Sequence, residues 1–412
     1  MANSSFESRA AFRYPSFRYF LGYRVLSVLS SEMLAVAVGW QVFELTHRPL
    51  DLGLVGLAQF LPGVLLFPLT GHAADRVPRR TILLVCLAGF SLASLLLLAF
   101  TIRGIQQVFP IYLVLLLNGA ARAFGQPAAQ ALLPTLVAEL HFPNAVAWSA
   151  STLRVAGIVG PIAGGLIYGF TRSPLWDYAL AFVAYIAALL LTTRIQAQPA
   201  ARPRLAPGTA MVLEGFRYIR RHPLIFGAIS LDLFAVLLGG AVALLPVYAS
   251  DILHVGATGL GIMRCAPGAG AVLTAVALAH YPLGRRQGAL MLWCVFGFGV
   301  FTVVFGLSRN LPVSLVALAL TGACDMVSVV VRSTMVQLGT PDHMRGRVSA
   351  VNTLFIGASN EVGQFESGIT AQWFGTVPAV VLGGLGTIVV VAAWAVLFPA
   401  LRQPKEEMAA TS

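Results

Sequence analysis

The sequence predicts an all-α integral membrane protein with twelve transmembrane helices, arranged as two six-helix bundles related by a pseudo-twofold axis. Three observations lead to this fold class: the composition, the number of long apolar stretches and a repeat between the two halves. Of the 412 residues, 58% are hydrophobic and only 10% are charged, and the mean hydropathy is +0.81. Soluble domains carry about 25% charged residues. This chain therefore cannot cover itself with a polar surface, and lipid must be its solvent.

Twelve apolar stretches are long enough to cross a hydrocarbon core of about 30 Å at about 1.5 Å per helical residue. They cover residues 17–45, 52–73, 81–102, 110–133, 145–171, 175–194, 223–250, 257–280, 289–307, 312–337, 346–374 and 376–400. A Pro-, Ala- and Arg-rich segment separates six stretches from six. It predicts an N-terminal bundle over 1–194, a cytoplasmic linker over 195–222 and a C-terminal bundle over 223–412. Within the linker, residues 213–221 favour a basic helix in the membrane interface.

A repeat of polar residues inside apolar helices relates the two halves. The sequence LNGAAR at 117–122 recurs 203 residues later as LTGACD at 320–325. Arg122 in the first half therefore stands where the second half has Asp325. Membrane proteins built from such repeats often bind ligands near the bilayer midplane, at the repeat interface. Opposite charges at matching positions predict a polar site there.

The distribution of basic residues sets the expected orientation. A formal net charge of +11 suggests nucleic acid as a partner, but the basic residues lie in short loops between apolar stretches. A membrane surface explains them, so no nucleic acid is expected. Counted from a cytoplasmic N-terminus, 18 of the 27 Arg and Lys residues fall on the cytoplasmic side, four on the outer side and five inside the membrane. Both termini are therefore expected in the cytoplasm.

Ionisable side chains at bilayer depth are functional candidates, since each costs about 2.5–3.5 kcal/mol on insertion scales. Arg332 follows Asp325 by two helical turns, which places both on one helix face about 10 Å apart. The residues expected to bind protons or substrate in a cavity are Glu32, Arg122, Asp232, Asp325, Arg332 and Glu361. Arg264 and Glu366 are expected to form a structural ion pair in the outer half, and Arg24 to extend toward the cytoplasmic face. Each group could instead belong to a buried ion pair that fixes helix packing and never titrates.

A run of small residues in the fifth stretch predicts a close helix contact. It contains Gly157, Gly160, Gly164 and Gly165 and is interrupted by Pro161. Such a run lets another helix approach backbone to backbone, and the proline is expected to bend its own helix.

The loop between the second and third stretches carries a further signature. It reads Gly71-His72-Ala73-Ala74-Asp75-Arg76-Val77-Pro78-Arg79-Arg80. This loop resembles the signature loop of the major facilitator superfamily, where a glycine, an aspartate-arginine pair and a basic cluster are expected. It departs from that pattern at Pro78, where the family usually has glycine. We expect Gly71, Asp75, Arg76, Arg79 and Arg80 to form a cytoplasmic gate. The alternative is that the arginines only enforce topology.

Two further segments narrow the resemblance. The small-residue run is similar to the antiporter motif of the same superfamily, with Ala156 in place of its leading glycine. Together with Arg154, residues 213–218 and 340–348 resemble the branch that holds the enterobactin exporters and macrolide-efflux proteins. By that resemblance the first, fourth, seventh and tenth helices line a central cavity, and most of the charged candidates lie on those helices.

The resemblance implies a multi-pass transporter of the bacterial inner membrane and not an enzyme. We expect it to export an amphipathic organic compound, siderophore or drug-like, by proton antiport through alternating access. Its expected partners are a small-molecule substrate, protons and the lipid bilayer, and it is expected to be a monomer. The sequence shows no nucleotide loop, metal-ligand cluster or nucleophile-base arrangement, so no cofactor or metal is expected. Two alternatives are a lysophospholipid transporter of the same fold, and a solute importer, which Asn118, Gln126 and Gln130 favour.

Overall fold

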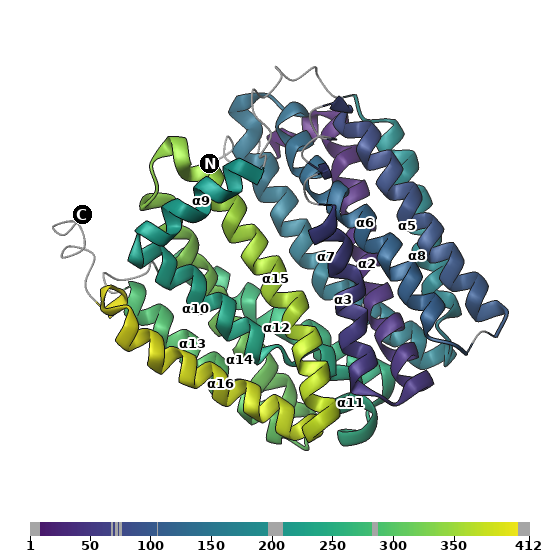
Figure 1. Cartoon of the computed structure of the whole chain (residues 1–412). Helices are drawn as coiled ribbons and strands as arrows, with labels where there is room; N and C mark the ends of the chain where they lie inside the picture. The colour runs from purple at the N-terminus through teal and green to yellow at the C-terminus, as the bar shows by residue number, and fades with distance from the viewer. Residues whose placement is uncertain are drawn as a thin grey trace. The chain divides into compact units, whose positions relative to one another are not determined.

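The chain is helical throughout the computed structural model, which describes residues 9–66, 69–70, 73, 76–104, 106–196, 209–281 and 287–402. These residues contain no β-strand (Figure 1). The chain divides into two compact units. Unit 1 contains residues 1–45 and 58–206, and unit 2 contains residues 46–57 and 207–412.

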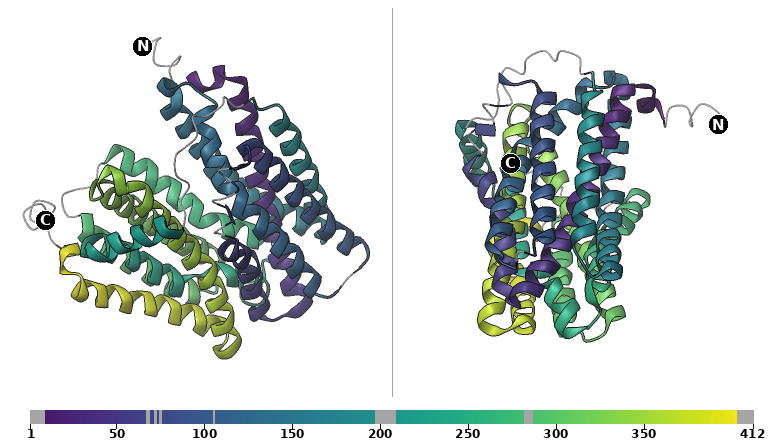
Figure 2. Two further views of the ribbon diagram at one scale, coloured as in Figure 1. Left: turned by 45° about the horizontal axis from the view of Figure 1, so that its top comes forward. Right: turned by 90° about the vertical axis from the view of Figure 1, so that its right-hand side faces the viewer.

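Unit 1 is built from long helices that lie side by side (Figure 2). They are α2 (Pro15–Thr46), the second part of α3 (Pro49–Leu65), α5 (Arg79–Ile102), α6 (Phe109–Leu132), α7 (Phe142–Thr171) and α8 (Leu175–Thr193). Proline stands in the first turn of α6 and α7, as Pro110 and Pro143. A first-turn residue needs no backbone N–H partner, so proline starts these helices without losing a hydrogen bond. α5 packs along both α6 and α8.

Apart from residues 46–57, which contain the first part of α3, unit 2 consists of the amphipathic helix of the linker and six membrane helices. They are α9 (Thr209–Arg221), α10 (Pro223–Gly239), α12 (Gly256–His280), α13 (Gln287–Leu307), α14 (Leu311–Leu338), α15 (Asp342–Phe374) and α16 (Thr376–Leu397). The predicted span 223–250 is not one regular helix. After α10 it continues through a 3₁₀ turn, the short α11 (Leu245–Val247) and a π-helical turn at Tyr248–Ile252. Gly375, with φ of 88°, forms the reversal between α15 and α16, a conformation that favours glycine.

Nine helical segments in the described part of the chain are long and apolar enough to cross a membrane. Three more helices complete the set. α3 has only 17 residues, α6 carries Arg122, and α15 carries both Glu361 and Glu366. Counted together, these helices give twelve spans, and the predicted fold class is confirmed.

The small-residue run of α7 lies against α2 inside unit 1. A Cβ added to Gly160 would lie 2.6 Å from the Cβ of Glu32, and one added to Gly164 would lie 3.0 Å from the backbone of Met33. A Cβ at Gly157 would meet no atom within 4 Å. Gly160 and Gly164 therefore allow the two helices to approach closely, and they set the position of the helix that carries Glu32.

Candidate functional site

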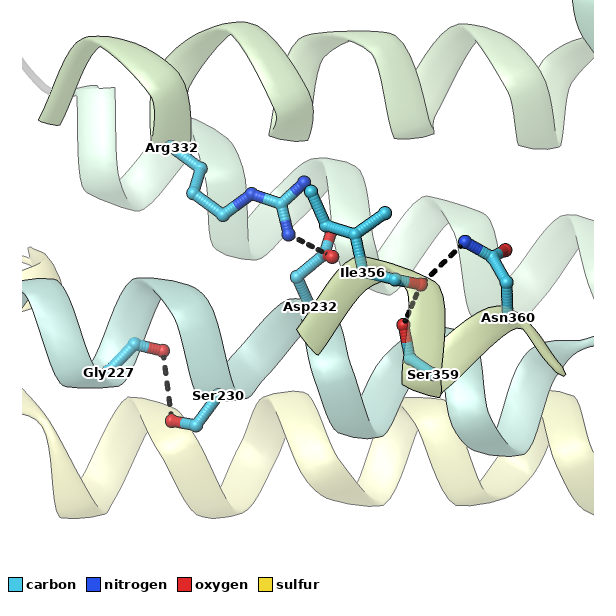
Figure 3. Close-up of polar contacts among 7 residues, drawn as sticks. All are labelled: Gly227, Ser230, Asp232, Arg332, Ile356, Ser359 and Asn360. Atoms are coloured by element: carbon cyan, nitrogen blue, oxygen red, sulfur yellow. Dashed lines mark hydrogen bonds and ion pairs between the residues drawn. The ribbon is translucent and has the colours of Figure 1, made fainter. Parts of the chain in front are cut away.

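A buried ion pair joins two helices of unit 2. The Arg332 guanidinium on α14 donates to the Asp232 carboxylate on α10 (Figure 3). Only 3% of the Arg332 side chain and 7% of the Asp232 side chain is exposed. A charge in such surroundings is costly unless it is paired, so each residue makes the other tolerable. Arg332 Nε has no hydrogen-bond partner among the described residues.

A second carboxylate lies beside this pair. Asp232 and Asp325 line the same small cavity of about 10 Å³, together with Ser328 and Cys324. The hydroxyl of Ser328 is buried and has no hydrogen-bond partner among the described residues. The structure thus gathers three of the predicted residues, Asp232, Asp325 and Arg332. The sequence placed Asp325 and Arg332 on one helix, but it did not indicate that Asp232 would bind the guanidinium.

Unit 1 contains a larger cavity, which we call the unit 1 cavity. It has a volume of about 110 Å³ and lies between α2, α5, α6 and α8. Arg24 and Arg122 both line it, together with Asn118, Gln126 and Tyr185. Arg24 was expected to extend toward the cytoplasmic face. Its Nε is buried, with no hydrogen-bond partner in the described part of the chain. The direction of the side chain as a whole stays a prediction.

The remaining predicted acids lie on α2 and α15. Glu32 lies where α2 meets Gly160 of α7, and its charge acts on Tyr185. Glu361 accepts a hydrogen bond of 3.2 Å from the side chain of Gln364, and Glu366 accepts one of 2.8 Å from Thr370. The pairing of Glu366 with Arg264 stays a prediction.

The basic residues of the predicted gate contact helix ends inside unit 1. Arg79 Nη1 donates to the carbonyl of Ala131 at 2.7 Å. Arg80 donates to the carbonyls of Thr192, at 3.2 Å, and Thr193. Carbonyls in the last turn of a helix lack partners within it and form the negative end of its dipole. Arg79 and Arg80 therefore cap α6 and α8.

The other residues of the sequence motifs lie in the signature loop and on α7. Gly71 and Asp75 lie outside the described residues, and the exposed Arg76 follows them. Arg154 of α7 is also exposed. The bend expected at Pro161 falls inside α7, which continues through it as a helix.

A polar cluster in unit 1 was missed by the sequence analysis. Glu44 accepts hydrogen bonds from Trp40 Nε1 at 2.6 Å and from the Tyr168 hydroxyl at 2.7 Å. The Asp177 carboxyl is fully buried, and neither of its oxygens has a hydrogen-bond partner among the described residues. Glu44 and Asp177 lie at the ends of predicted spans, where hydropathy says little about depth. The spacing of Trp40 and Glu44, one helical turn apart, was the available signal.

The linker helix α9 is fixed to α15 within unit 2. Arg347 Nη1 pairs with Glu214 at 2.6 Å, and a Cβ added to Gly215 would lie 2.7 Å from the carbonyl oxygen of Arg347. The Tyr218 hydroxyl donates to the carbonyl of Gly339 at 3.3 Å. The basic, exposed side chains of α9 lie on its other face, at Arg217, Arg220 and Arg221.

Comparison with known structures supports the fold. A bacterial homologue of the human lysosomal transporter Spinster, in an inward-facing and occupied conformation, matches with a TM-score of 0.74 and 12% identity over 94% of this chain and 98% of that one. The nucleoside transporter NupG, as its D323A mutant, matches with a TM-score of 0.71 and 13% identity over 92% of this chain and 100% of that one. At these identities the likeness concerns the fold alone.

Comparison of sequences gives the family. The enterobactin exporter EntS of Shigella boydii serotype 4 (strain Sb227) is 29% identical over 379 residues, which cover 91% of this chain and 86% of that one. The protein of the same name from Escherichia coli O9:H4 (strain HS) is also 29% identical over 379 residues, with the same coverage of both chains. The model of the family described as "Transmembrane secretion effector" matches residues 6–412. The chain therefore belongs to this family of major facilitator transporters, and it is a membrane transporter and not an enzyme.

Proposed function

We propose that the protein exports an amphipathic organic compound, siderophore or drug-like, in exchange for protons. Transport proceeds by alternating access of two halves, residues 1–194 and 223–412, which the linker 195–222 joins. The observation that carries this proposal is the buried Asp232–Arg332 pair, with Asp325 lining the same small cavity. The relatives named as enterobactin exporters support a siderophore-like cargo.

The ion pair supplies a means of coupling. A nearby guanidinium favours the charged form of a carboxyl group. If Arg332 moves from Asp232 toward Asp325 between the two states of the cycle, the carboxyl group that it leaves gains affinity for a proton. A proton bound in one state and released in the other links proton flow to the conformational change.

The proposed setting is the bacterial inner membrane, with a monomer whose termini both lie in the cytoplasm. The excess of arginine in alternate loops supports this orientation. A green fluorescent protein fused to the C-terminus fluoresces only when it folds in the cytoplasm, so a fluorescent fusion is expected. Gly71, Asp75, Arg76, Arg79 and Arg80 are proposed to form the cytoplasmic gate, and Asp75→Asn should then slow transport.

Transport in proteoliposomes tests the function directly. Purified protein is reconstituted with a trapped pH-sensitive dye, a proton gradient is imposed, and enterobactin or erythromycin is added outside. We expect uptake of one of these compounds together with a rise in luminal pH, both abolished by a protonophore. Uptake that ignores the gradient would contradict antiport, and gradient-independent movement of a lysophospholipid would support a lipid transporter instead.

A further inference from the structure

We propose that the unit 1 cavity binds an anionic group carried on a planar aromatic ring, such as an aromatic carboxylate or phenolate. The inference rests on the proposed function only for the statement that this ligand is the cargo. Binding itself does not depend on proton coupling. Its support comes from the helix faces that meet at the cavity, the charges on them and the rings beside them.

Four helices line the cavity, and two of them, α2 and α6, turn a polar face toward it. On α2 the lining residues follow a helical spacing of three and four, and on α6 they follow a spacing of four and three, so each set lies on one face. The residues that supply polar groups from α2 and α6 are Arg24, Ser27, Ser31, Asn118, Arg122 and Gln126. Buried polar groups are costly unless they are hydrogen-bonded. Polar faces inside an apolar bundle therefore indicate a site for a ligand that supplies hydrogen-bond partners.

The lining carries positive charge. Two guanidinium groups, from Arg24 and Arg122, line the cavity, and no carboxylate does so among the described residues. Glu32 follows Ser31 on α2, and its charge acts on Tyr185, so one acid lies near two arginines. Arg24 also interacts with the hydroxyl of Tyr23. The cavity therefore favours a ligand that brings negative charge.

Two unsatisfied groups sit one helical turn apart at this site. Arg24 Nε and Ser27 Oγ are both buried, and neither has a hydrogen-bond partner in the described part of the chain. An N–H donor and a hydroxyl on the same helix face can both bind one anionic oxygen. Hydrogen bonds from a guanidinium to an anion are short and about twice as strong as neutral ones.

Aromatic rings from α5 and α8 form another part of the lining. Phe90 of α5 and Tyr185 of α8 stack with their centroids 5.3 Å apart and their planes 25° from parallel, and both line the cavity. Stacked rings beside guanidinium groups suit a flat ring with an acidic substituent. At about 110 Å³ the cavity holds one such group of a larger compound.

A matched pair of probes tests the charge preference. 2-Naphthoate and 2-naphthylmethylammonium share one ring system and carry opposite charges. Each is titrated at constant ionic strength against the purified full-length protein, and binding is followed by the rise in Tm. We expect saturable stabilisation by 2-naphthoate and none by the cation. Equal or tighter binding of the cation would overturn the proposal, because the cavity would then not favour a negatively charged ligand.

Variants locate the site. Arg24→Gln removes the charge and the buried N–H. It should lower the affinity for 2-naphthoate roughly tenfold to a hundredfold. Arg24→Lys keeps the charge but loses the planar fork, so its loss should be smaller. Arg103→Gln removes an exposed arginine at the end of α5 and should bind like the parent. Unchanged binding by Arg24→Gln, or an equal loss with Arg103→Gln, would contradict the assignment.

A labelling experiment serves if the arginine variants do not fold. Cys86 lines the cavity, and the other cysteines, at 265, 294 and 324, can be replaced by serine. 2-Naphthoate should then slow the reaction of Cys86 with a small methanethiosulfonate, and 2-naphthylmethylammonium should not. Equal rates with and without 2-naphthoate would sink the site. Anion binding without proton-driven transport would contradict the proposed function but support the anion site. Proton-driven transport without anion binding would support the proposed function and contradict the anion site.

Discussion

Removing one partner of the Asp232–Arg332 pair should be far more destabilising than removing one partner of an exposed pair. Asp232→Asn leaves the Arg332 guanidinium, 3% exposed, without its carboxylate. Stranding a buried charge in this way costs about 3–5 kcal/mol. Glu214 and Arg347 form a pair within the same unit, but their side chains are 52% and 25% exposed. Glu214→Gln should therefore cost about 1 kcal/mol or less.

The free energy of unfolding can be measured by SDS titration in detergent micelles, followed by circular dichroism. The double variant Asp232→Asn with Arg332→Gln should be more stable than the sum of the two single changes implies, since neither charge is then stranded. An Asp232→Asn cost no larger than that of Glu214→Gln would refute the reasoning. A double variant whose losses simply add would refute it as well.

Three more predictions concern packing, coupling and the acids of α15. Gly160→Ala should lower the Tm through an overpacking cost of about 1–3 kcal/mol, whereas Gly157→Ala, with open space around it, should not; equal effects would contradict the contact with α2. Asp325→Asn should abolish gradient-driven transport while the protein still inserts and folds, and normal uphill transport would remove its coupling role. Glu366→Gln should lower thermal stability more than Glu361→Gln, and Glu361→Gln should flatten the pH dependence of transport; opposite results would exchange the two roles.

Hydropathy predicted the number of spans because lipid imposes the same requirement on every crossing helix. It could not predict the irregular end of the seventh span, where backbone geometry changes after Gly239 within an apolar sequence. The acid Asp232 was recognisable as a residue at bilayer depth. Its partner was not, because pairing with Arg332 depends on how α10 and α14 are rotated about their axes.

Arg80 and Arg24 differ most in how well the sequence predicted their surroundings. Arg80 follows the positive-inside pattern, and its contact with the end of α8 is a local consequence of helix polarity. Arg24 lies near the end of an apolar stretch, so snorkelling was the natural expectation. Its place in the lining of a cavity was not predictable from the sequence, because that cavity forms only when four helices come together.

The caps that Arg79 and Arg80 place on α6 and α8 have a consequence for the cavity between these helices. Both arginines belong to the first turn of α5. The N-terminus of α5 is therefore bonded to the C-terminal ends of both α6 and α8. The walls contributed by α5, α6 and α8 are therefore fixed to one another before any ligand arrives. A ligand that enters such a preorganised space does not bear the entropy of assembling it, so weakening the caps should lower affinity without changing a single residue of the lining.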